Sequence, residues 1–256
     1  MSRYVCHFSC GAPSAVAAKL TLTAHPPPDE VIVLNAFVAE EHPDNRRFLA
    51  DCELWLGLQI TVARDEKYGA SAREVWRARR YIMGKNGAPC SKELKRNVLD
   101  ALCRPDDVHV LGYTADEQDR WDRLIDANNE RRLEAPLITA NLSKSDCLAI
   151  IERSGLTLPM SYRQGYRNPN CICCPQAGEG TWNRWRQDYP DDFEEVARIQ
   201  DMIGPGSFFF RNRKTGERYG VRDLPPDKGH HIEPDVSCSF FCEMAERKIG
   251  KTHTDK

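Results

Sequence analysis

Hydrophobic and polar positions alternate over the first 156 residues in a pattern that switches repeatedly between strand and helix. Short apolar runs rich in β-branched residues predict strands at residues 4–8, 31–39, 59–64, 107–113 and 136–142. Stretches with helical spacing predict helices at residues 14–25, 45–57, 71–83, 91–103 and 143–155. This alternation predicts an α/β fold, a Rossmann-like sandwich whose parallel sheet is covered on both faces and binds ligands at the carboxyl ends of its strands.

The pattern changes after residue 156, where glycine, proline, cysteine, tryptophan and arginine become frequent. Residues 208–220 predict a hairpin that turns at Thr215 and Gly216. We therefore expect an α/β domain over residues 1–156 and a cysteine-rich C-terminal region over residues 157–256.

Charge and cysteine content narrow the class of protein. The chain has 36 basic and 38 acidic residues, so its net charge of −2 gives no general attraction for duplex nucleic acid. We find neither a membrane-length apolar run nor a signal-peptide pattern, so we expect a cytoplasmic protein without a membrane partner. An odd count of 11 cysteines argues against a disulfide framework. The cysteines expected as small core hydrophobes are Cys6, Cys52, Cys103 and Cys147.

The junction between the first strand and the first helix carries the pattern Ser9-x-Gly11-x-x-Ser14. The first N–H groups of a helix bind anions, Gly11 permits close backbone approach, and the two hydroxyls add donors. A plain serine cap beside a turn glycine explains the same six residues equally well. The pattern is neither a Walker motif nor a dinucleotide-binding fingerprint.

The loop resembles the pyrophosphate-binding loop of the PP-loop ATP pyrophosphatases, with Cys10 in place of the first glycine. Three later segments resemble the phosphoadenylylsulfate (PAPS) reductase family, in the phage-type branch of the adenine nucleotide α-hydrolase-like proteins. They are NGAPCSKELKR from residue 86, GYTADEQDR from residue 112 and LPMSYRQGYRNPNCICC from residue 158. The resemblance covers roughly residues 4 to 195, with all four motifs in the family's order.

This resemblance implies an adenine nucleotide, ATP or a sulfonucleotide, with Mg²⁺ accompanying ATP. The implied nucleotide-binding residues are Ser9, Cys10, Gly11, Ser14, Gly112, Glu117 and Arg120. Arg120 suits a phosphate or sulfate, and a salt bridge to a neighbouring acid is its alternative. Glu40, Glu41 and His42 end the second strand near the ribose or Mg²⁺, unless they only begin a helix. The helix after Cys90 offers Lys92, Lys95 and Arg96 to the phosphates, or exposes them to solvent.

A cysteine set accompanies the nucleotide motifs. Cys171-x-x-Cys174 is a spacing that lets two thiolates reach one metal. The resemblance implies a [4Fe-4S] cluster on Cys90, Cys171 and Cys174, with Cys242 as the candidate fourth ligand and Cys238 beside it. A three-cysteine cluster with one open iron site is a second arrangement. Zinc is the alternative metal, on Cys171, Cys174, Cys238 and Cys242, which His230 or His231 could join.

One departure from the family bears on the reaction. Sulfonucleotide reductases carry a C-terminal Glu-Cys-Gly-x-His motif with the nucleophilic cysteine, and the sequence SCSFFCE around residue 240 lacks its glycine and histidine. Cys238 and Cys242 remain the candidate catalytic thiolates. The resemblance thus implies a PAPS reductase-like oxidoreductase or a PP-loop ATP pyrophosphatase that adenylylates an acceptor and transfers sulfur.

The partners expected with this chemistry are an electron or sulfur donor protein and a nucleic acid acceptor, while a homodimer stays open. Trp182, Arg184, Trp185 and Arg186 suit stacking on bases, although packing over the cysteines explains the tryptophans better. The hypothesis from another class is a non-catalytic nucleotide sensor or nucleic-acid-binding protein with a structural zinc.

Overall fold

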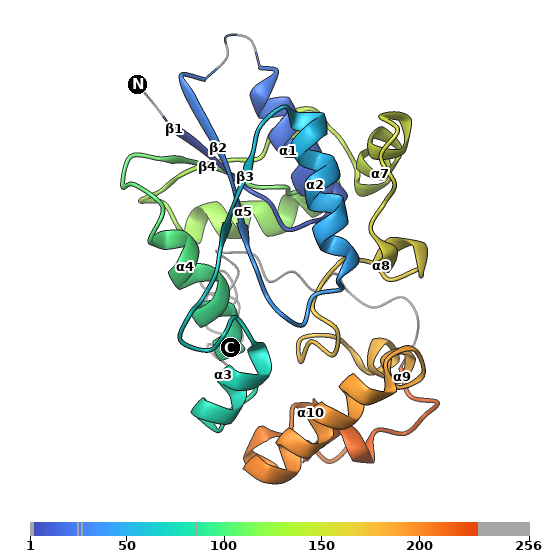
Figure 1. Ribbon diagram of the computed structural model, residues 1–256. Coiled ribbons are helices and arrows are strands. Elements are labelled where there is room, and N and C mark those ends of the chain that lie inside the picture. Colours follow the sequence, from blue (N-terminus) through green and yellow to red (C-terminus); the bar gives the residue numbers. More distant parts are fainter. Residues whose placement is uncertain (1–2, 25, 27, 85–86, 230–256) are drawn as a thin grey trace.

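The computed structural model describes residues 3–24, 26, 28–84 and 87–229. A five-stranded parallel sheet with strand order β3-β2-β1-β4-β5 forms its centre (Figure 1). Its strands are β1 (Arg3–His7), β2 (Glu30–Ala36), β3 (Ile60–Ala63), β4 (Val108–Val110) and β5 (Arg132–Glu134). Because all five strands are parallel, their carboxyl ends meet at one edge, which confirms the predicted α/β class.

Helices cover both faces of the sheet. The α-helices are α1 (Ala12–Leu22), α2 (Asp44–Leu56), α3 (Ala72–Arg79), α4 (Asn97–Asp100), α5 (Gln118–Ala127), α6 (Pro136–Thr139), α7 (Lys144–Arg153), α8 (Met160–Arg163), α9 (Glu179–Asp188) and α10 (Pro190–Ile203). A π-helix, η1 (Ser91–Arg96), runs into α4, and short 3₁₀ turns are η2 (Ala115–Glu117), η3 (Pro205–Ser207) and η4 (Val221–Asp223). The described helices include none that is both long and apolar enough for a membrane span.

Three hydrophobic cores hold these layers together. The first packs α1, α2 and α7 on one face of the sheet, around Phe48 and Ile151. The second covers the other face and includes Leu99 of α4 and Leu124 of α5. The third packs α3, α9 and α10 around Trp182, away from the sheet. In Figure 1, α9 and α10 lie beyond the edge of the sheet, below α8.

The fifth strand is not where the hydrophobic pattern placed it. Residues 136–139 form α6, and the strand is the preceding segment, Arg132–Glu134. Pro136 lies in the first turn of α6, where its fixed φ favours a helix and its missing N–H costs nothing. Because β5 is an edge strand with two exposed side chains, Arg132 and Glu134, it lacks the apolar run of a central strand.

The predicted hairpin forms as β6 (Phe210–Arg211) and β7 (Arg218–Tyr219), and the helix predicted at residues 91–103 begins as the π-helix η1. The segment after α7 is attached to α2. Arg47 donates to the carbonyl groups of Thr157 and Leu158, and the N–H of Met160 donates to Asp44 at 2.7 Å. These bonds place α8 at the carboxyl edge of the sheet.

A histidine pair lies across β1 and β4, with His109 buried and His7 partly buried. Nε2 of His7 is 3.0 Å from Nδ1 of His109, and the two rings stack at 5.3 Å. Burial and the charge of His109 lower the pKa of His7 to about 3, and burial also lowers the pKa of His109. Both rings are therefore neutral at pH 7.

This pair predicts a loss of stability in mild acid. His7 takes up a proton near pH 6.5 in the unfolded chain but only near pH 3 in the folded protein. The free energy of unfolding therefore falls as the pH drops from 6.5 towards 3. For His7 we expect a decrease of about 2 kcal/mol in the free energy of unfolding between pH 6.5 and 5. Urea denaturation of wild type and His7→Leu at pH 7 and pH 5 tests this, because the variant should lose less. Equal losses would contradict it.

Candidate functional site

The loop between β1 and α1 is organised by the hydroxyl of Ser14. This hydroxyl donates to the carbonyl of Gly11 at 2.9 Å and accepts from the backbone N–H and the hydroxyl of Ser9, at 3.1 and 3.3 Å. Ser14 is buried, whereas Ser9 is exposed. Gly11 is the N-cap of α1 and Pro13 lies in its first turn, so the positive end of the helix faces the loop.

Cys10 stands where the PP-loop motif that this loop resembles has glycine, and its backbone conformation is one that favours glycine. Its φ is +58°, a left-handed conformation that a side chain disfavours by about 1 kcal/mol. Its sulfur is fully buried, 3.4 Å from Nη2 of Arg46 and 3.7 Å from Nδ2 of Asn35. Burial raises the pKa of the thiol, so Cys10 stays protonated and acts through its backbone and packing.

A pocket of about 150 Å³ opens above this loop, at the carboxyl ends of β1, β2 and β4. One part of its wall is apolar and comes from Leu34, Ala36, Leu99, Leu111 and Tyr113. The other part is polar and comes from Ser9, Ser14, Glu41, Lys95, Glu117, Lys144, Asn168 and Asn170. An apolar surface beside a helix N-terminus and lysines suits a ligand with a flat ring and an anionic group.

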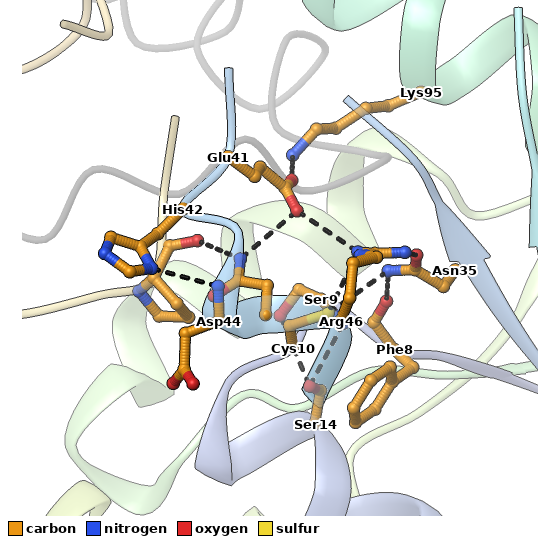
Figure 2. Close-up of polar contacts among 12 residues, drawn as sticks. Phe8, Ser9, Cys10, Ser14, Asn35, Glu41, His42, Asp44, Arg46 and Lys95 are labelled. Carbon is orange, nitrogen blue, oxygen red and sulfur yellow. Dashed lines mark hydrogen bonds and ion pairs between the residues drawn. The ribbon is translucent and has the colours of Figure 1, made fainter. Parts of the chain in front are cut away.

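A polar network fastens the loop to the neighbouring strand and helices (Figure 2). Arg46 donates to Oδ1 of Asn35 at 3.0 Å, and Asn35 donates to the carbonyl of Phe8 at 2.9 Å. Glu41 then pairs with Lys95 at 3.1 Å and with Arg46 at 3.7 Å. The Glu41 carboxylate is nearly buried, at 5% exposure, so these cations compensate a charge that water does not reach.

The three polar residues after β2 have separate tasks. Glu40 accepts from the backbone N–H of Ala72 at 2.8 Å, so it caps α3. His42 accepts from the N–H of Asp44 at 3.0 Å, at the start of α2. None of the three residues begins a helix itself. Glu40 stabilises the start of the distant helix α3 and His42 that of α2, while Glu41 lines the pocket.

Gly112 and Glu117 line the pocket, whereas Arg120, on α5, is not among its lining residues. A Cβ on Gly112 would come within 2.8 Å of the Ser14 nitrogen, so only glycine lets β4 approach the loop this closely. Glu117 lines the pocket and accepts from the N–H of Thr114 at 3.2 Å. Arg120 forms an ion pair with Glu117 at 2.8 Å and lies over the ring of Tyr113. The salt bridge considered for Arg120 is thus present.

Several residues of the site were not identified from the sequence. Arg46 belongs to the polar network, and the pocket residues are Asn35, Lys144, Tyr162, Asn168 and Asn170. Asn35 did carry a signal, because an amide near the end of an otherwise apolar strand is unusual. Tyr162 reaches the loop from α8, and its hydroxyl would be 3.2 Å from a Cβ on Gly11. No local sequence pattern predicts this contact, because it joins segments about 150 residues apart in the sequence.

Cys90, Cys171 and Cys174 line one small cavity of about 20 Å³ next to the pocket. Cys90 precedes η1. Cys171 pairs with Glu41 in an isolated bridge, and the N–H of Ile172 donates to the carbonyl of Glu40 at 2.8 Å. The carbonyl of Cys174 accepts from Nε1 of Trp182 at 3.1 Å. The structure therefore brings together the three cysteines that the sequence had assigned to one site.

The donor set of this cavity fits a metal that prefers thiolates. Sulfur ligands select zinc and iron–sulfur clusters. Within the described residues, no group of three or more His, Cys, Asp or Glu side chains is placed to hold a single metal ion, so these three cysteines do not by themselves form a mononuclear site. Cys238, Cys242, His230 and His231 lie outside the described residues.

The remaining cysteines are structural in character. Cys6, Cys52 and Cys147 are buried in the core, as expected, and burial raises the pKa of each thiol to about 12. Cys103 is only half-buried and packs against the second core. Cys173 is fully buried in the third core with a φ of +58°. Trp182 and Trp185 are buried in the same core, which agrees with the packing interpretation.

The contact at Gly112 predicts that substitution by alanine will destabilise the protein much more at Gly112 than at a second glycine, Gly206. Gly112→Ala should lower the free energy of unfolding by about 1–3 kcal/mol, because the new methyl group meets rigid backbone of the loop. Gly206→Ala is the matched control, since nothing lies within 4 Å of its Cβ position. Urea denaturation of both variants measures the difference. If the two behaved alike, β4 and the loop would not be in tight contact.

Comparisons with known proteins give a limited result. No family model matches the chain, and no curated protein matches it. Among solved structures it is similar to the U34-tRNA thiolase NcsA from Methanococcus maripaludis with its [4Fe-4S] cluster. The two chains share 14% identity with a TM-score of 0.41, over 79% of this chain and 72% of that chain.

Proposed function

We propose that this chain is an enzyme of sulfur chemistry that binds an adenine nucleotide at the Ser9–Ser14 loop. One observation carries the proposal: the pocket at the start of α1 and the cysteine cavity are neighbours and share Lys95 as a lining residue. A nucleotide with its phosphates at the start of α1 lies beside the thiols of Cys90, Cys171 and Cys174. The apolar wall of Leu34, Leu111 and Tyr113 receives the base.

The resemblance to the PAPS reductase family offers two reactions, and the departure at the C-terminus favours the second. In that reaction an acceptor oxygen attacks the α-phosphorus of ATP, and the bond to pyrophosphate breaks. A sulfide donor then attacks the adenylylated carbon, so that a carbon–sulfur bond forms as the carbon–oxygen bond breaks and AMP leaves with the acceptor's oxygen. The N–H groups at the start of α1 and the hydroxyl of Ser9 stabilise the phosphate charge during the first step.

Lys95 connects the two steps in this proposal. Its ammonium group is held by Glu41 at 3.1 Å on the wall between the pocket and the cavity. There the ammonium group, held by Glu41, would donate a hydrogen bond to a phosphate on one side and lie beside the thiols on the other. Cys90, Cys171 and Cys174, with Cys242 as the fourth ligand, would hold a [4Fe-4S] cluster, which supplies electrons or an iron site for sulfur.

Nucleotide binding is tested at the serines. Ser9→Ala together with Ser14→Ala should weaken ATP binding by about 100-fold, because the Ser9 hydroxyl donor to phosphate is lost together with the Ser14 bonds that shape the loop. Ser9→Ala alone should weaken it about tenfold, and it leaves the bond from Ser14 to Gly11 in place. Calorimetric titration with ATP, ADP and a sulfonucleotide measures this, with Ser154→Ala, at the end of α7, as the control. Unchanged affinity in Ser9→Ala would argue against phosphate at this loop.

The metal is tested on protein purified without oxygen. We expect a brown protein with about four irons and four sulfides per chain. Cys171→Ala should lose the iron and keep nucleotide affinity, whereas Ser9→Ala should keep the iron, and Cys103→Ala should change neither. A colourless wild type with one zinc would contradict the cluster. Equal loss of iron in Cys171→Ala and Ser9→Ala would contradict two separate sites.

The choice between the two reactions follows from their products. Release of pyrophosphate from ATP with a sulfur acceptor present supports adenylylation, and release of sulfite from a sulfonucleotide with a reductant supports reduction. Tight binding with neither product would indicate a nucleotide sensor and would overturn the proposed enzyme.

A further inference from the structure

The hairpin formed by β6 and β7 carries an unusual concentration of positive charge. Residues 211–218 contain four cations, Arg211, Arg213, Lys214 and Arg218, and one carboxylate, Glu217. All five side chains are exposed. The whole chain has a net charge of −2, so the hairpin is more positively charged than the chain as a whole. It is a small basic surface on an acidic protein.

The register of the hairpin places two of these arginines directly opposite each other. Arg211 of β6 pairs with Arg218 of β7. Directly opposed residues of an antiparallel pair project to the same face, with Cβ atoms about 5 Å apart, and like charges there are destabilising. No carboxylate of the described chain pairs with Arg211, Arg213 or Lys214. Such an arrangement costs the folded protein stability and becomes favourable when an external anion bridges the guanidinium groups.

The turn that presents these cations is rigid. Oδ1 of Asn212 accepts from the N–H of Lys214 at 2.9 Å, and the carbonyl of Asn212 accepts from the N–H of Gly216 at 2.8 Å. Gly216 has a φ of +74°, which suits its place in the turn. Glu217 is occupied, since its carboxylate accepts from the hydroxyl of Thr215 at 3.2 Å. Arg213 and Lys214 therefore stand at a tip held by these bonds, and within the described residues neither forms an ion pair with a carboxylate.

The base of the hairpin is attached to the cysteine region. Phe210 is 5% exposed and packs edge-on against Trp182, at 5.9 Å between ring centroids. Trp182 in turn donates to the carbonyl of Cys174. In Figure 1 the orange-to-red segment that follows α10 lies beside α9 and α10. A partner held by the hairpin is thus positioned relative to the cysteines by a continuous packed core.

We propose that this basic hairpin binds the phosphate backbone of a nucleic acid. Arginine forms bidentate hydrogen bonds with phosphate, and three of the four cations are arginines on a narrow, rigid ribbon. A linear polyanion supplies an anion at each of these positions, whereas an acidic peptide offers less regular charge. In the proposed function, this nucleic acid would be the acceptor of sulfur, and that part of the inference rests on the proposed function. Binding of the nucleic acid to the hairpin does not require a bound adenine nucleotide.

The test is fluorescence anisotropy of the full chain with a fluorescein-labelled, 20-nucleotide single-stranded RNA, without ATP. Arg213→Ser together with Lys214→Ser should weaken binding about tenfold at moderate salt and lower the slope of log K against log salt by about 1.4, because about 0.7 is lost per phosphate contact. Arg123→Ser together with Arg153→Ser makes the same charge change on α5 and α7 and should alter neither. Equal effects of both pairs, or no RNA binding by wild type, would overturn the proposal.

A second variant separates binding from folding. Arg211→Thr removes the opposed charge, so the midpoint of thermal unfolding should rise while RNA binding weakens. A fall in that midpoint would overturn the argument from like charges. Polyglutamate is the competitor, and displacement of the RNA by polyglutamate at equal charge concentration would assign the surface to an acidic protein instead. Because the assay contains no ATP, a failure of nucleotide binding at Ser9 leaves its outcome unaffected.

Discussion

The short segment after β2 is the point on which both sites depend. The carboxylate of Glu40 caps α3 and its carbonyl pairs with Ile172 of the cysteine loop, while Glu41 binds Lys95 and Arg46. Two adjacent residues thereby connect the sheet, α3, η1 and the loop that carries Cys171. Glu41 is nearly buried, so loss of both cations would leave its charge without compensation, at a cost of about 3–5 kcal/mol. The position of Lys95 between the pocket and the cysteine cavity follows from this pairing.

The parallel sheet explains why chemistry gathers at this edge. The loops that follow β1, β2 and β4 all begin at this edge, so backbone N–H groups, hydroxyl groups and charged side chains from three separate parts of the sequence meet there. The cost is local: Cys10 adopts a left-handed conformation, and Gly112 has no room for a side chain. Strain of this kind persists because the network of Arg46 and Asn35 holds the loop from the other side.

The two sites and the basic hairpin form one line of contacts. The pocket shares Lys95 with the cysteine cavity, Cys174 contacts Trp182, and Trp182 packs against Phe210 of the hairpin. In the proposed function, the cysteines and the polyanionic acceptor would share the core made by α3, α9 and α10, and the nucleotide pocket would border the cysteine cavity at Lys95. That arrangement suits a reaction in which an activated acceptor must remain in place until sulfur reaches it.

Local sequence determined the elements whose signal lies in neighbouring residues. The strand ending at His7, the serine–glycine turn, the capped helix α7 and the 208–220 hairpin all follow from spacing, caps and turn residues. The hydrophobic pattern did not predict β5, because an edge strand with polar side chains has no apolar run. It placed a strand instead over the next residues, where Pro136 favours the helix α6. Tertiary structure alone decided that Tyr162 reaches the loop, that Lys95 lies between two cavities, and that Arg211 faces Arg218. The physical reason is that these relations are set by sheet order, strand register and the ion pairs that join distant segments.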